Sequence, residues 1–400
     1  MIISIYGIPR SGKDTFINEI LKKVNAIHIK GSEVLNRISY TIYNDKFKNL
    51  NTNQQNDVRL LFANEVKELS PSYNIVIVDG HYSFPNNHSF SSVFTEADLN
   101  LYDTFFYLKR TGEEIARNFN LGDKKEYSEY LLDKNKAEEW MQYEITQLQS
   151  IVEKVDKDLI VLDSSIDSID FVCNYKSTSM EIANRISKEI SQLPKKRIII
   201  TDLDRTISIN DLTNDFIERE EIDPLLPKKI FSGDYYTQFQ FWKFHTLLRR
   251  SLSYDESIRY AVNKIQLNKD LILDVLSKKN IATSVIGITT GIADAWNVIN
   301  QRVGLMDKIY GYNGEIIVTP LVKKLVVKNL TKEFEVIAIG DSIVDLEMLM
   351  NANKGYIISM TKLDQRVIKA YEENKIKTPL FQLPYSIFKY DFFKEDCLRW

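Results

Sequence analysis

Two sets of residues in this chain have the types and spacing to act on phosphate. The first is the loop GIPRSGKDT at 7–15, and the second is a pair of acidic segments, DLDRT at 202–206 and GDSIVD at 340–345. Glycines let backbone N–H groups surround phosphate oxygens, and clustered carboxylates can attack phosphorus or hold a hard cation. The loop therefore predicts phosphate transfer from a nucleotide, and the acidic segments predict hydrolysis of a phosphomonoester.

The composition limits the class of protein. With 400 residues, 44% of them hydrophobic, the chain is long enough for two domains with separate cores. No apolar run is long enough to span a membrane and the first residues do not resemble a secretion signal, so we expect a cytoplasmic protein. Two cysteines and four scattered histidines indicate neither a disulfide framework nor a zinc site, and a net charge of −3 argues against extensive contact with nucleic acid.

Short apolar runs alternate with helix-length stretches through both halves of the chain. They lie at 2–8, 74–80, 104–110 and 158–164 in the first half, and at 197–201, 282–289, 334–341 and 354–360 in the second. Strands that are apolar on both faces and separated by helices are typical of parallel sheets covered by helices. We therefore expect an α/β protein with two doubly wound parallel-sheet domains.

The polar segment SQLPKKR at 191–197 interrupts this pattern, and we place the domain boundary there. The expected domains are a phosphate-loop domain at 1–190 and a second α/β domain at 195–400. Between the first two strands of the second domain lies a long stretch with aromatic and helical patterns and no convincing strand. An insertion of this size at the carboxyl end of a strand predicts a helical cap over a site, at about 208–280.

The loop at 7–15 follows an apolar strand and opens a helical pattern, which is the context that a phosphate-binding loop requires. Its backbone N–H groups and the helix N-terminus would hold phosphate, and Lys13 would reach the phosphoryl group that is transferred. The position after Lys13, which usually carries the hydroxyl that binds magnesium, is Asp14, and Thr15 supplies a hydroxyl one residue later. The expected ATP-binding residues of the loop are Gly7, Arg10, Ser11, Gly12, Lys13, Asp14 and Thr15.

The GKDT sequence of this loop resembles a variant found in kinases of the nucleoside-monophosphate-kinase type. The resemblance covers about residues 1–190 and implies ATP and Mg²⁺ as cofactors, with Thr15 as a metal ligand. For the segment HIKGSEVLNR it implies that Arg37 binds an acceptor phosphate. It also implies a lid that begins at YLKRTGEEIARN, in which Arg110 and Arg117 bind ATP and stabilise charge in the transition state.

Asp79 ends the apolar run NIVIVDG, so its carboxylate should emerge at the carboxyl edge of a parallel strand, where ligands bind in such sheets. It could hold hydrated magnesium or accept a proton from the attacking hydroxyl. A turn or helix-capping aspartate is the structural alternative. The neighbouring His81 is expected to be structural.

Asp202 and Asp204 are two residues apart on an extended segment, so both side chains should project the same way at the end of a strand. DLDRT, followed much later by GDSIVD after another strand, resembles the haloacid dehalogenase superfamily of phosphatases. The resemblance implies that Asp202 attacks phosphorus and that Asp204 acts as general acid and base. It also implies a Mg²⁺ site formed by Asp202, the main-chain carbonyl of Asp204 and Asp341, with Asp345 as a further ligand or as a residue that orients one.

The same resemblance predicts further side chains in the site. A hydroxyl at the end of the middle strand should bind a phosphoryl oxygen, and VIGITTG offers Thr289 first and Thr290 second. A lysine should neutralise charge between phosphate and nucleophile, and LVKKLVVKNL offers Lys323 first and Lys324 second. Thr206, the last residue of DLDRT, completes the expected contacts with the substrate.

DLDRT resembles the phosphoserine-phosphatase-like branch of that superfamily, which carries a helical cap, although Arg205 stands where glycine is common. Such a cap would shield the site from water and contact the leaving group. Most of its aromatic residues should form the core of the cap. The residues among which specificity is expected are Tyr235, Tyr236, Phe239, Trp242, Lys243, Arg249 and Arg250.

These residues support three hypotheses about function. The first is a bifunctional enzyme that phosphorylates a nucleotide or small-molecule acceptor with ATP and hydrolyses a small phosphomonoester with Mg²⁺ through an aspartyl-phosphate. The second is a polynucleotide kinase and phosphatase that acts on 5′-hydroxyls and 3′-phosphates; the fusion favours it, and the cap and the acidic first domain oppose it. The third is a phosphatase whose phosphate-loop domain only senses nucleotide.

Overall fold

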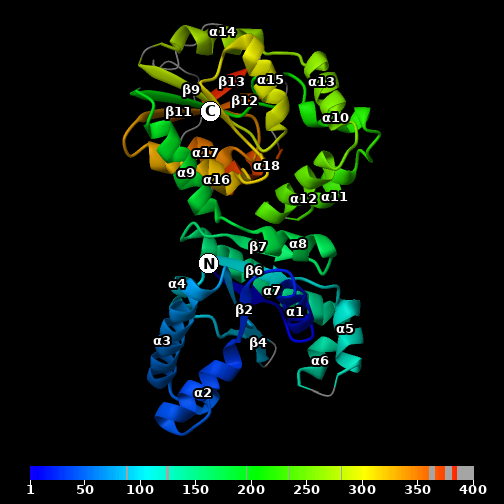
Figure 1. Ribbon diagram of the computed structural model, residues 1–400, viewed down its shortest axis with the longest axis vertical. Coiled ribbons are helices and arrows are strands. Elements are labelled where there is room, and N and C mark those ends of the chain that lie inside the picture. The colour runs from blue at the N-terminus through cyan, green and yellow to red at the C-terminus, as the bar shows by residue number, and fades with distance from the viewer. Residues whose placement is uncertain are drawn as a thin grey trace. The chain divides into compact units, whose positions relative to one another are not determined.

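The computed structural model describes residues 1–86, 89–122, 126–194, 196–233, 235–280, 282–359, 365–373 and 381–384. The chain divides into two compact units, Met1–Thr178 and Ser179–Trp400. Each unit contains a parallel sheet with helices on both faces (Figure 1). The predicted fold class, α/β with two doubly wound domains, is therefore confirmed.

The sheet of the first unit has five parallel strands in the order β2-β3-β1-β6-β7. These strands are β1 (Ile2–Tyr6), β2 (Ala26–Lys30), β3 (Ile75–Asp79), β6 (Thr104–Leu108) and β7 (Leu159–Leu162). Both faces are buried: on β6, Phe105 packs on Tyr6 on one face, and Phe106 packs on Phe171 on the other. Because β1 lies between β3 and β6, the segments that follow these three strands meet at one edge of the sheet.

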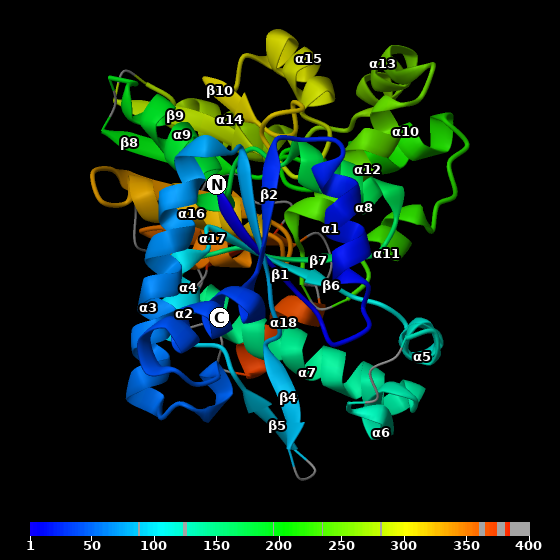
Figure 2. The same ribbon diagram turned by 60° about the horizontal axis from the view of Figure 1, so that its bottom comes forward.

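Helices connect these strands. They are α1 (Lys13–Leu21), α2 (Gly31–Tyr43), α3 (Thr52–Leu69), α4 (Glu96–Leu101), α5 (Gly112–Asn120), α6 (Ser128–Leu131), α7 (Lys134–Glu153) and α8 (Ile166–Asn174), with 3-10 turns at Phe47–Asn49 and Ser70–Ser72. The antiparallel hairpin of β4 (Ser83–Asn86) and β5 (Ser89–Ser92) follows β3 and projects away from the sheet, as Figure 2 shows. α1 begins directly after the phosphate loop, which is the arrangement that the sequence predicts.

The sheet of the second unit has six parallel strands in the order β10-β9-β8-β11-β12-β13. They are β8 (Arg197–Thr201), β9 (Thr283–Ile288), β10 (Lys308–Tyr310), β11 (Glu335–Gly340), β12 (Lys354–Ser359) and β13 (Phe381–Pro384). Alternate residues of β8 face two separate apolar cores, with Ile199 in one and Ile198 and Ile200 in the other. Burial on both faces explains why these strands read as uninterrupted apolar runs.

The helices of the second unit follow the same alternation. They are α9 (Ser179–Ser191), α10 (Leu212–Arg219), α11 (Leu226–Ile230), α12 (Gln238–Arg249), α13 (Tyr254–Lys264), α14 (Lys269–Lys278), α15 (Ala293–Val303), α16 (Pro320–Leu330), α17 (Leu346–Asn351) and α18 (Gln365–Glu372). The insertion predicted at about 208–280 is helical, and α10 to α13 gather on one side of the unit (Figure 1). Among the described residues, no helix has the length and apolarity to cross a membrane.

The boundary between the units lies before α9, not after it as the limits of 1–190 and 195–400 required. The buried residues of α9, Ile182, Ile186 and Ile190, belong to the same core as Ile198 and Ile200 of β8. α9 is therefore a helix of the second unit. The polar segment predicted to separate two domains belongs to that unit, and Pro194 follows the end of α9 at Ser191.

Candidate active sites

The phosphate loop runs from the end of β1 to the first turn of α1. Two glycines permit its tight path: a Cβ on Gly7 would lie 2.8 Å from Ser11 Oγ, and Gly12 has a φ of 82°. Arg10 also adopts a left-handed conformation, with a φ of 69°. The loop thus curls over the N-terminus of α1, whose free N–H groups are suited to bind phosphate oxygens.

Lys13 opens α1, and its side chain is buried against the loop. Its Nζ donates to the carbonyl oxygens of Gly7, at 2.6 Å, and Ile8, at 3.4 Å. Burial lowers the pKa of Lys13 to about 8, against the attraction of three nearby carboxylates. Phosphoryl oxygens would stabilise the charged form better than these carbonyls do, so the position suits the predicted contact with phosphate.

The segment predicted to begin a lid lies against the same loop. Arg110 donates from Nε to the Ser11 carbonyl oxygen at 2.9 Å, and Asn118 donates to the Arg10 carbonyl oxygen at 3.0 Å. Arg110 is thus brought to the loop. Arg117 lies in the last turn of α5.

Asp79 ends β3 beside the loop, and β2 pairs with β3 so that His28 lies opposite Ile77, two residues before Asp79. His28 Nε2 lies 3.4 Å from Asp79 Oδ1, and the Gly31 N–H donates to that oxygen at 3.3 Å. Burial raises the pKa of Asp79, but His28 and Lys13 lower it, and the net pKa lies below its usual value. Asp79 is therefore held as a carboxylate next to the phosphate loop.

Asp14 and Thr15 are exposed in the first turn of α1. One oxygen each of Asp14 and Asp79 and a ring nitrogen of His28 lie within 4.8 Å of one another. Carboxylate and imidazole groups are common ligands of divalent cations. The donor set at this edge of the sheet therefore fits a divalent cation of the kind that ATP chemistry requires, and it includes a histidine that the sequence did not single out.

Arg37, the predicted acceptor clamp, lies on α2 and forms an ion pair with Glu65 of α3. Glu65 also lines a pocket of about 330 Å³ between β2, α2 and α3, together with His28, Lys30 and Glu33. His28 connects this pocket to the cluster beside the phosphate loop. An acceptor phosphate would have to displace the Glu65 carboxylate before it could bind Arg37.

Two more residues close to the loop were not predicted to act there. Glu144 of α7 is fully buried and accepts hydrogen bonds from the Ser83 N–H and the Tyr107 hydroxyl, each at 2.8 Å. Burial raises the pKa of Glu144. His81, expected to be structural, has Nδ1 2.9 Å from the Gly7 carbonyl oxygen. Glu144 is distant in sequence and reaches this region through the packing of α7, so no sequence signal pointed to it.

In the second unit, the predicted catalytic residues meet at the carboxyl ends of the central strands. Asp202 and Asp204 follow β8, Thr289 follows β9, Asp341 follows β11, Asp345 begins α17 and Lys323 projects from α16. Because β8 lies between β9 and β11, these ends are neighbours. Each of these side chains except Asp341 belongs to a buried residue. They form one enclosed, mainly acidic site.

Lys323 connects two of the aspartates. Its Nζ donates to Asp202 Oδ1 at 2.6 Å and to Asp345 Oδ1 at 2.7 Å, and its side chain is 1% exposed. Burial lowers the pKa of Lys323, but the two carboxylates raise it by more, and the net pKa lies above its usual value. Lys324, the other candidate, pairs with Glu347 at 3.2 Å. Lys323 is therefore the better placed of the two to act on Asp202.

Asp204 is held by two donors. The Leu212 N–H donates to Oδ1 at 2.9 Å, and Trp296 Nε1 donates to Oδ2 at 3.2 Å. Burial, followed by the charges of Asp211 and Asp202, raises the pKa of Asp204 to about 8. An acid that keeps its proton at neutral pH can protonate a leaving oxygen, which is the role predicted for it. Trp296 was not predicted from the sequence.

Carboxylate oxygens of Asp202, Asp341 and Asp345 lie within 4.8 Å of one another. Burial and neighbouring carboxylates raise the pKa of Asp202 to about 6 and that of Asp341 to about 8. A bound cation would relieve this repulsion, and an all-oxygen donor set suits Mg²⁺. Asp345 already accepts from Lys323 through Oδ1 and from the Ser342 hydroxyl through Oδ2, at 3.1 Å. Asp202 also accepts from Lys323 through Oδ1, but its Oδ2 accepts a long hydrogen bond from Thr206, at 3.4 Å, whereas three donors face Asp345 Oδ2. Asp202 and Asp341 are therefore better placed to bind the ion directly.

Thr289 is buried beside Asp204. The Gly291 N–H donates to Thr289 Oγ1 at 2.9 Å, and a Cβ on Gly291 would lie 2.4 Å from Asp204 Oδ2. Glycine at this position therefore lets the loop after β9 approach the acid. Thr206 Oγ1 donates to Asp202 Oδ2 at 3.4 Å, so this predicted residue also lies in the site.

α12 of the insertion contacts the loop that follows β9. His245 Nε2 lies 2.9 Å from the Thr290 carbonyl oxygen, and its ring stacks on Tyr312 with 4.6 Å between centroids. Arg249 pairs with Asp294 at 2.8 Å and lies over the Tyr312 ring. Thr290 thus joins the site loop to the cap through its carbonyl, and Arg249 lies near this junction.

Other aromatic residues of the cap contact one another. Phe239 stacks on Trp242 with 6.3 Å between ring centroids, and Tyr236 packs on Phe231 and Phe241. These contacts agree with the expectation that most of the cap aromatics form its core.

Arg205 has a φ of 58°, a left-handed conformation that favours glycine. Its Nε lies 3.4 Å from Asp341 Oδ2 and 3.8 Å from Asp211 Oδ2. These ion pairs link a predicted metal ligand to the N-cap of α10 and offset the cost of the strained backbone.

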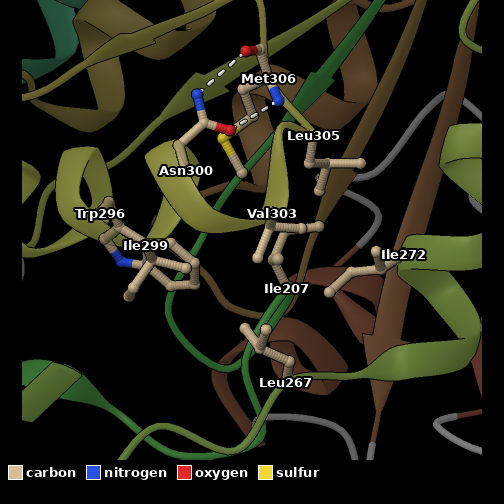
Figure 3. A pocket seen from close by; sticks show the side chains of 9 residues that line it. All are labelled: Ile207, Leu267, Ile272, Trp296, Ile299, Asn300, Val303, Leu305 and Met306. Atoms are coloured by element: carbon tan, nitrogen blue, oxygen red, sulfur yellow. Dashed lines mark hydrogen bonds between the residues drawn. The ribbon is translucent and has the colours of Figure 1, made fainter. Parts of the chain in front are cut away.

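A small cavity, whose lining side chains Figure 3 shows, lies next to Trp296. It measures about 10 Å³ and is lined by Ile207, Leu267, Ile272, Trp296, Ile299, Asn300, Val303, Leu305 and Met306. Asn300 and Met306 exchange two hydrogen bonds, at 3.0 and 2.8 Å. A cavity of this size holds one water at most, and its apolar lining disfavours even that, so we assign it no ligand.

Comparisons with known proteins test whether the two units resemble known kinase-like and phosphatase-like domains. Residues 6–130, less than half of the chain, match a family model described as AAA domain. No curated protein matches the chain. The family match agrees with the phosphate-loop domain that the sequence predicts in the first unit.

Solved structures similar to the chain include phosphatases and a kinase. A phospho-aspartyl intermediate analogue of phosphoserine phosphatase is 20% identical, with 44% of this chain and 99% of that chain covered and a TM-score of 0.35. A HAD family hydrolase from Salmonella enterica subsp. enterica serovar Typhi is 18% identical, with coverages of 55% and 80% and a TM-score of 0.38. A shikimate kinase from Bacteroides thetaiotaomicron is 12% identical, with coverages of 48% and 98% and a TM-score of 0.27. Similarities at this level assign no role to individual residues, so the roles rest on the geometry of this chain.

Proposed function

We propose that the chain is a bifunctional enzyme, with an ATP-dependent kinase in its first unit and a Mg²⁺-dependent phosphomonoester phosphatase in its second. The observation that carries the proposal is the buried contact of Lys323 with Asp202 and Asp345, next to Asp204. The contact supports a role for Asp202 as the nucleophile and for Lys323 as the residue that neutralises charge, with Asp204 as the acid beside them. The path of the phosphate loop over Lys13 supports the kinase half.

In the phosphatase half, the Asp202 carboxylate would attack phosphorus and form an aspartyl-phosphate as the ester P–O bond breaks. Asp204 in its acid form would give its proton to the leaving oxygen, and its carboxylate would then take a proton from the water that hydrolyses the aspartyl-phosphate. Asp202 and Asp341 would hold Mg²⁺, which supplies positive charge between the nucleophile and the anionic substrate. Lys323 would neutralise further charge, and Thr289 would bind a phosphoryl oxygen.

In the kinase half, the loop N–H groups would bind ATP phosphates, and Lys13 and Arg110 would contact the phosphoryl group that moves. Asp79, kept as a carboxylate, would accept the proton of the acceptor hydroxyl or hold a hydrated cation. We assign the acceptor to the pocket between β2, α2 and α3. Glu33 and Glu65 line that pocket and pair with Lys30 and Arg37. An anionic acceptor would have to displace these carboxylates from their partners, so we propose a small hydroxylated acceptor rather than a strongly anionic one.

A polynucleotide kinase and phosphatase is the second candidate, and the fusion of two phosphate-handling units in one chain favours it. A polymer end would need an open, basic channel, whereas the net charge is −3 and helices of the insertion contact the loop beside the phosphatase site. A phosphatase with a nucleotide-sensing domain is the third candidate. For the proposed bifunctional enzyme, the use of ATP leads us to expect a cytoplasmic location.

The test is to offer labelled ATP with small hydroxylated metabolites, nucleoside monophosphates and 5′-hydroxyl oligonucleotides, with the Lys13→Ala chain as the blank. We expect label on a small acceptor in the wild-type chain only. Label on oligonucleotides alone would replace the proposal with the polynucleotide function. An absence of transfer to every acceptor, with phosphatase activity intact, would favour the nucleotide sensor.

A further inference from the structure

Three side chains from three separate elements meet beside the phosphate loop. Asp14 lies in the first turn of α1, His28 on β2 and Asp79 at the end of β3, and their ligand atoms lie within 4.8 Å of one another. The cluster is therefore a product of the strand order, which pairs β2 with β3 and places β3 next to β1. Lys13, the neighbouring cation, points its Nζ at the carbonyl oxygens of Gly7 and Ile8 instead.

His28 supplies an independent indication that a cation binds here. Its side chain is 10% exposed, and Nε2 is buried without a hydrogen bond of good geometry among the described residues, although it faces Asp79 Oδ1 at 3.4 Å. A buried polar nitrogen without a hydrogen bond is costly, and groups of this kind are normally satisfied by a partner or an ion. Here the imidazole faces carboxylates, and a divalent cation could bind both the imidazole nitrogen and the carboxylate oxygens.

We propose that Asp14, His28 and Asp79 form a divalent-cation site that takes up its ion without nucleotide and prefers Mn²⁺ or Co²⁺ to Mg²⁺. A hydroxyl after Lys13 would be a weak, neutral ligand that depends on nucleotide phosphates to complete the site, whereas two carboxylates carry enough charge to hold the ion themselves. The imidazole nitrogen adds the preference, because Mg²⁺ selects oxygen donors and transition-metal ions accept nitrogen readily. Binding of the ion does not depend on the proposed kinase function; only a role for the ion in phosphate transfer rests on it.

The test is a titration of the full chain with Mn²⁺ in the absence of nucleotide, with free Mn²⁺ followed by electron paramagnetic resonance. The Asp341→Asn substitution weakens the other carboxylate site, so binding that persists in this chain and is lost with His28→Gln is assigned to the first unit. We expect one Mn²⁺ per Asp341→Asn chain, displaced by Mg²⁺ only at a more than about tenfold excess. Adding His28→Gln, or Asp14→Ser, should weaken Mn²⁺ binding by at least about tenfold.

Glu19→Gln is the matched control, because Glu19 is a carboxylate on α1 that pairs with Lys22 and lies outside the cluster. It should leave Mn²⁺ binding unchanged, and a far-UV circular dichroism spectrum like that of wild type should show that each variant is folded. The inference is overturned if the Asp341→Asn chain binds no Mn²⁺ without nucleotide, or if His28→Gln leaves the affinity unchanged. If the cation site fails this test but the chain still binds ATP and phosphorylates an acceptor, the proposed kinase function stands without the site. If Mn²⁺ binds as expected but no acceptor is phosphorylated, the cation site stands and the proposed kinase function fails.

Discussion

The two phosphate sites differ in how their charged side chains are satisfied. In the second unit, Lys323 bonds to two carboxylates inside the protein, and the side chains of Lys323 and Asp345 are each 1% exposed. In the first unit, Lys13 is bonded to backbone carbonyls and Asp14 is exposed. The aspartate site thus pairs its lysine with carboxylates of its own unit and leaves only excess negative charge for a cation. In the loop, the lysine bonds to backbone carbonyls and is left for nucleotide phosphates. Mutations should therefore affect the two sites differently.

The sharpest contrast is expected from one substitution in each site. Asp202→Asn removes the nucleophile and should lower phosphatase kcat by at least about a thousandfold while kinase activity is retained. Lys13→Ala should lower kinase activity and spare the phosphatase, because the residues lie in separate units. Hydrolysis of a chromogenic phosphomonoester and label transfer from ATP measure the two activities. If either substitution abolishes both, the assignment of two independent sites is wrong.

Lys323→Met tests whether the charges of the second unit depend on one another. It leaves two buried carboxylates without their cation, so the free energy of unfolding at neutral pH should fall by about 3–5 kcal/mol, and phosphatase activity should be lost. Lys324→Met is the neighbouring control, since its partner Glu347 has a side chain that is 46% exposed and such pairs contribute under about 1 kcal/mol. Urea denaturation followed by circular dichroism compares them. Equal losses of unfolding free energy in the two variants would contradict the proposal that Lys323 neutralises the buried carboxylates.

A pH titration tests the contact between the cap and the site loop in the second unit. Burial, with a smaller contribution from Arg249, lowers the pKa of His245 from its usual value near 6.5 to about 4, although Thr290 and Asp294 oppose the shift. In the unfolded chain, His245 therefore becomes protonated below about pH 6.5, whereas in the folded chain it becomes protonated only near pH 4. The stability associated with neutral His245 is present above pH 6.5 and falls as the pH drops, by at most about 3 kcal/mol at pH 4.

His245→Gln isolates this effect, because glutamine can still donate to the Thr290 carbonyl but does not titrate. Buried acids such as Asp204, whose pKa is raised, change stability in the opposite direction, so the informative quantity is the difference between wild type and variant. That difference should shrink between pH 6.5 and pH 4 as wild type loses its advantage. A difference that stays constant over this range would mean that His245 titrates alike in the folded and unfolded chains.

The sequence predicted the second site more completely than the first, and strand geometry explains why. Asp202 and Asp204 are neighbours on one extended segment, and Thr289 and Asp341 follow strands whose apolar runs are easily recognised. The ends of adjacent parallel strands converge, so these residues could be brought together without knowledge of packing. To choose between the adjacent lysines, one has to know which face of α16 is buried. Lys323 lies on that face, and Lys324 does not.

What the sequence missed depends on contacts between elements whose order it does not reveal. His28 reaches Asp79 only because β2 is the neighbour of β3, and Trp296 reaches Asp204 only through the packing of α15. Glu144 arrives from α7 in the same way. The boundary after α9 was misplaced for a related reason, since the amphipathic pattern of a helix shows that one face is buried but not against which core.

The smallest expected effect concerns Arg37, where the sequence and the structure suggest different acceptors. Arg37→Ala removes the exposed pair with Glu65 and should change stability by less than about 1 kcal/mol. If the acceptor is a small hydroxylated molecule in the adjacent pocket, its KM should change by less than about threefold, because no anionic group depends on Arg37. A phosphorylated acceptor would instead lose a charge-assisted contact, and KM should rise by about tenfold or more. Label-transfer kinetics with each class of acceptor therefore decide whether the arginine is a clamp, and a large rise in KM would favour the phosphorylated acceptor that the resemblance implies for Arg37.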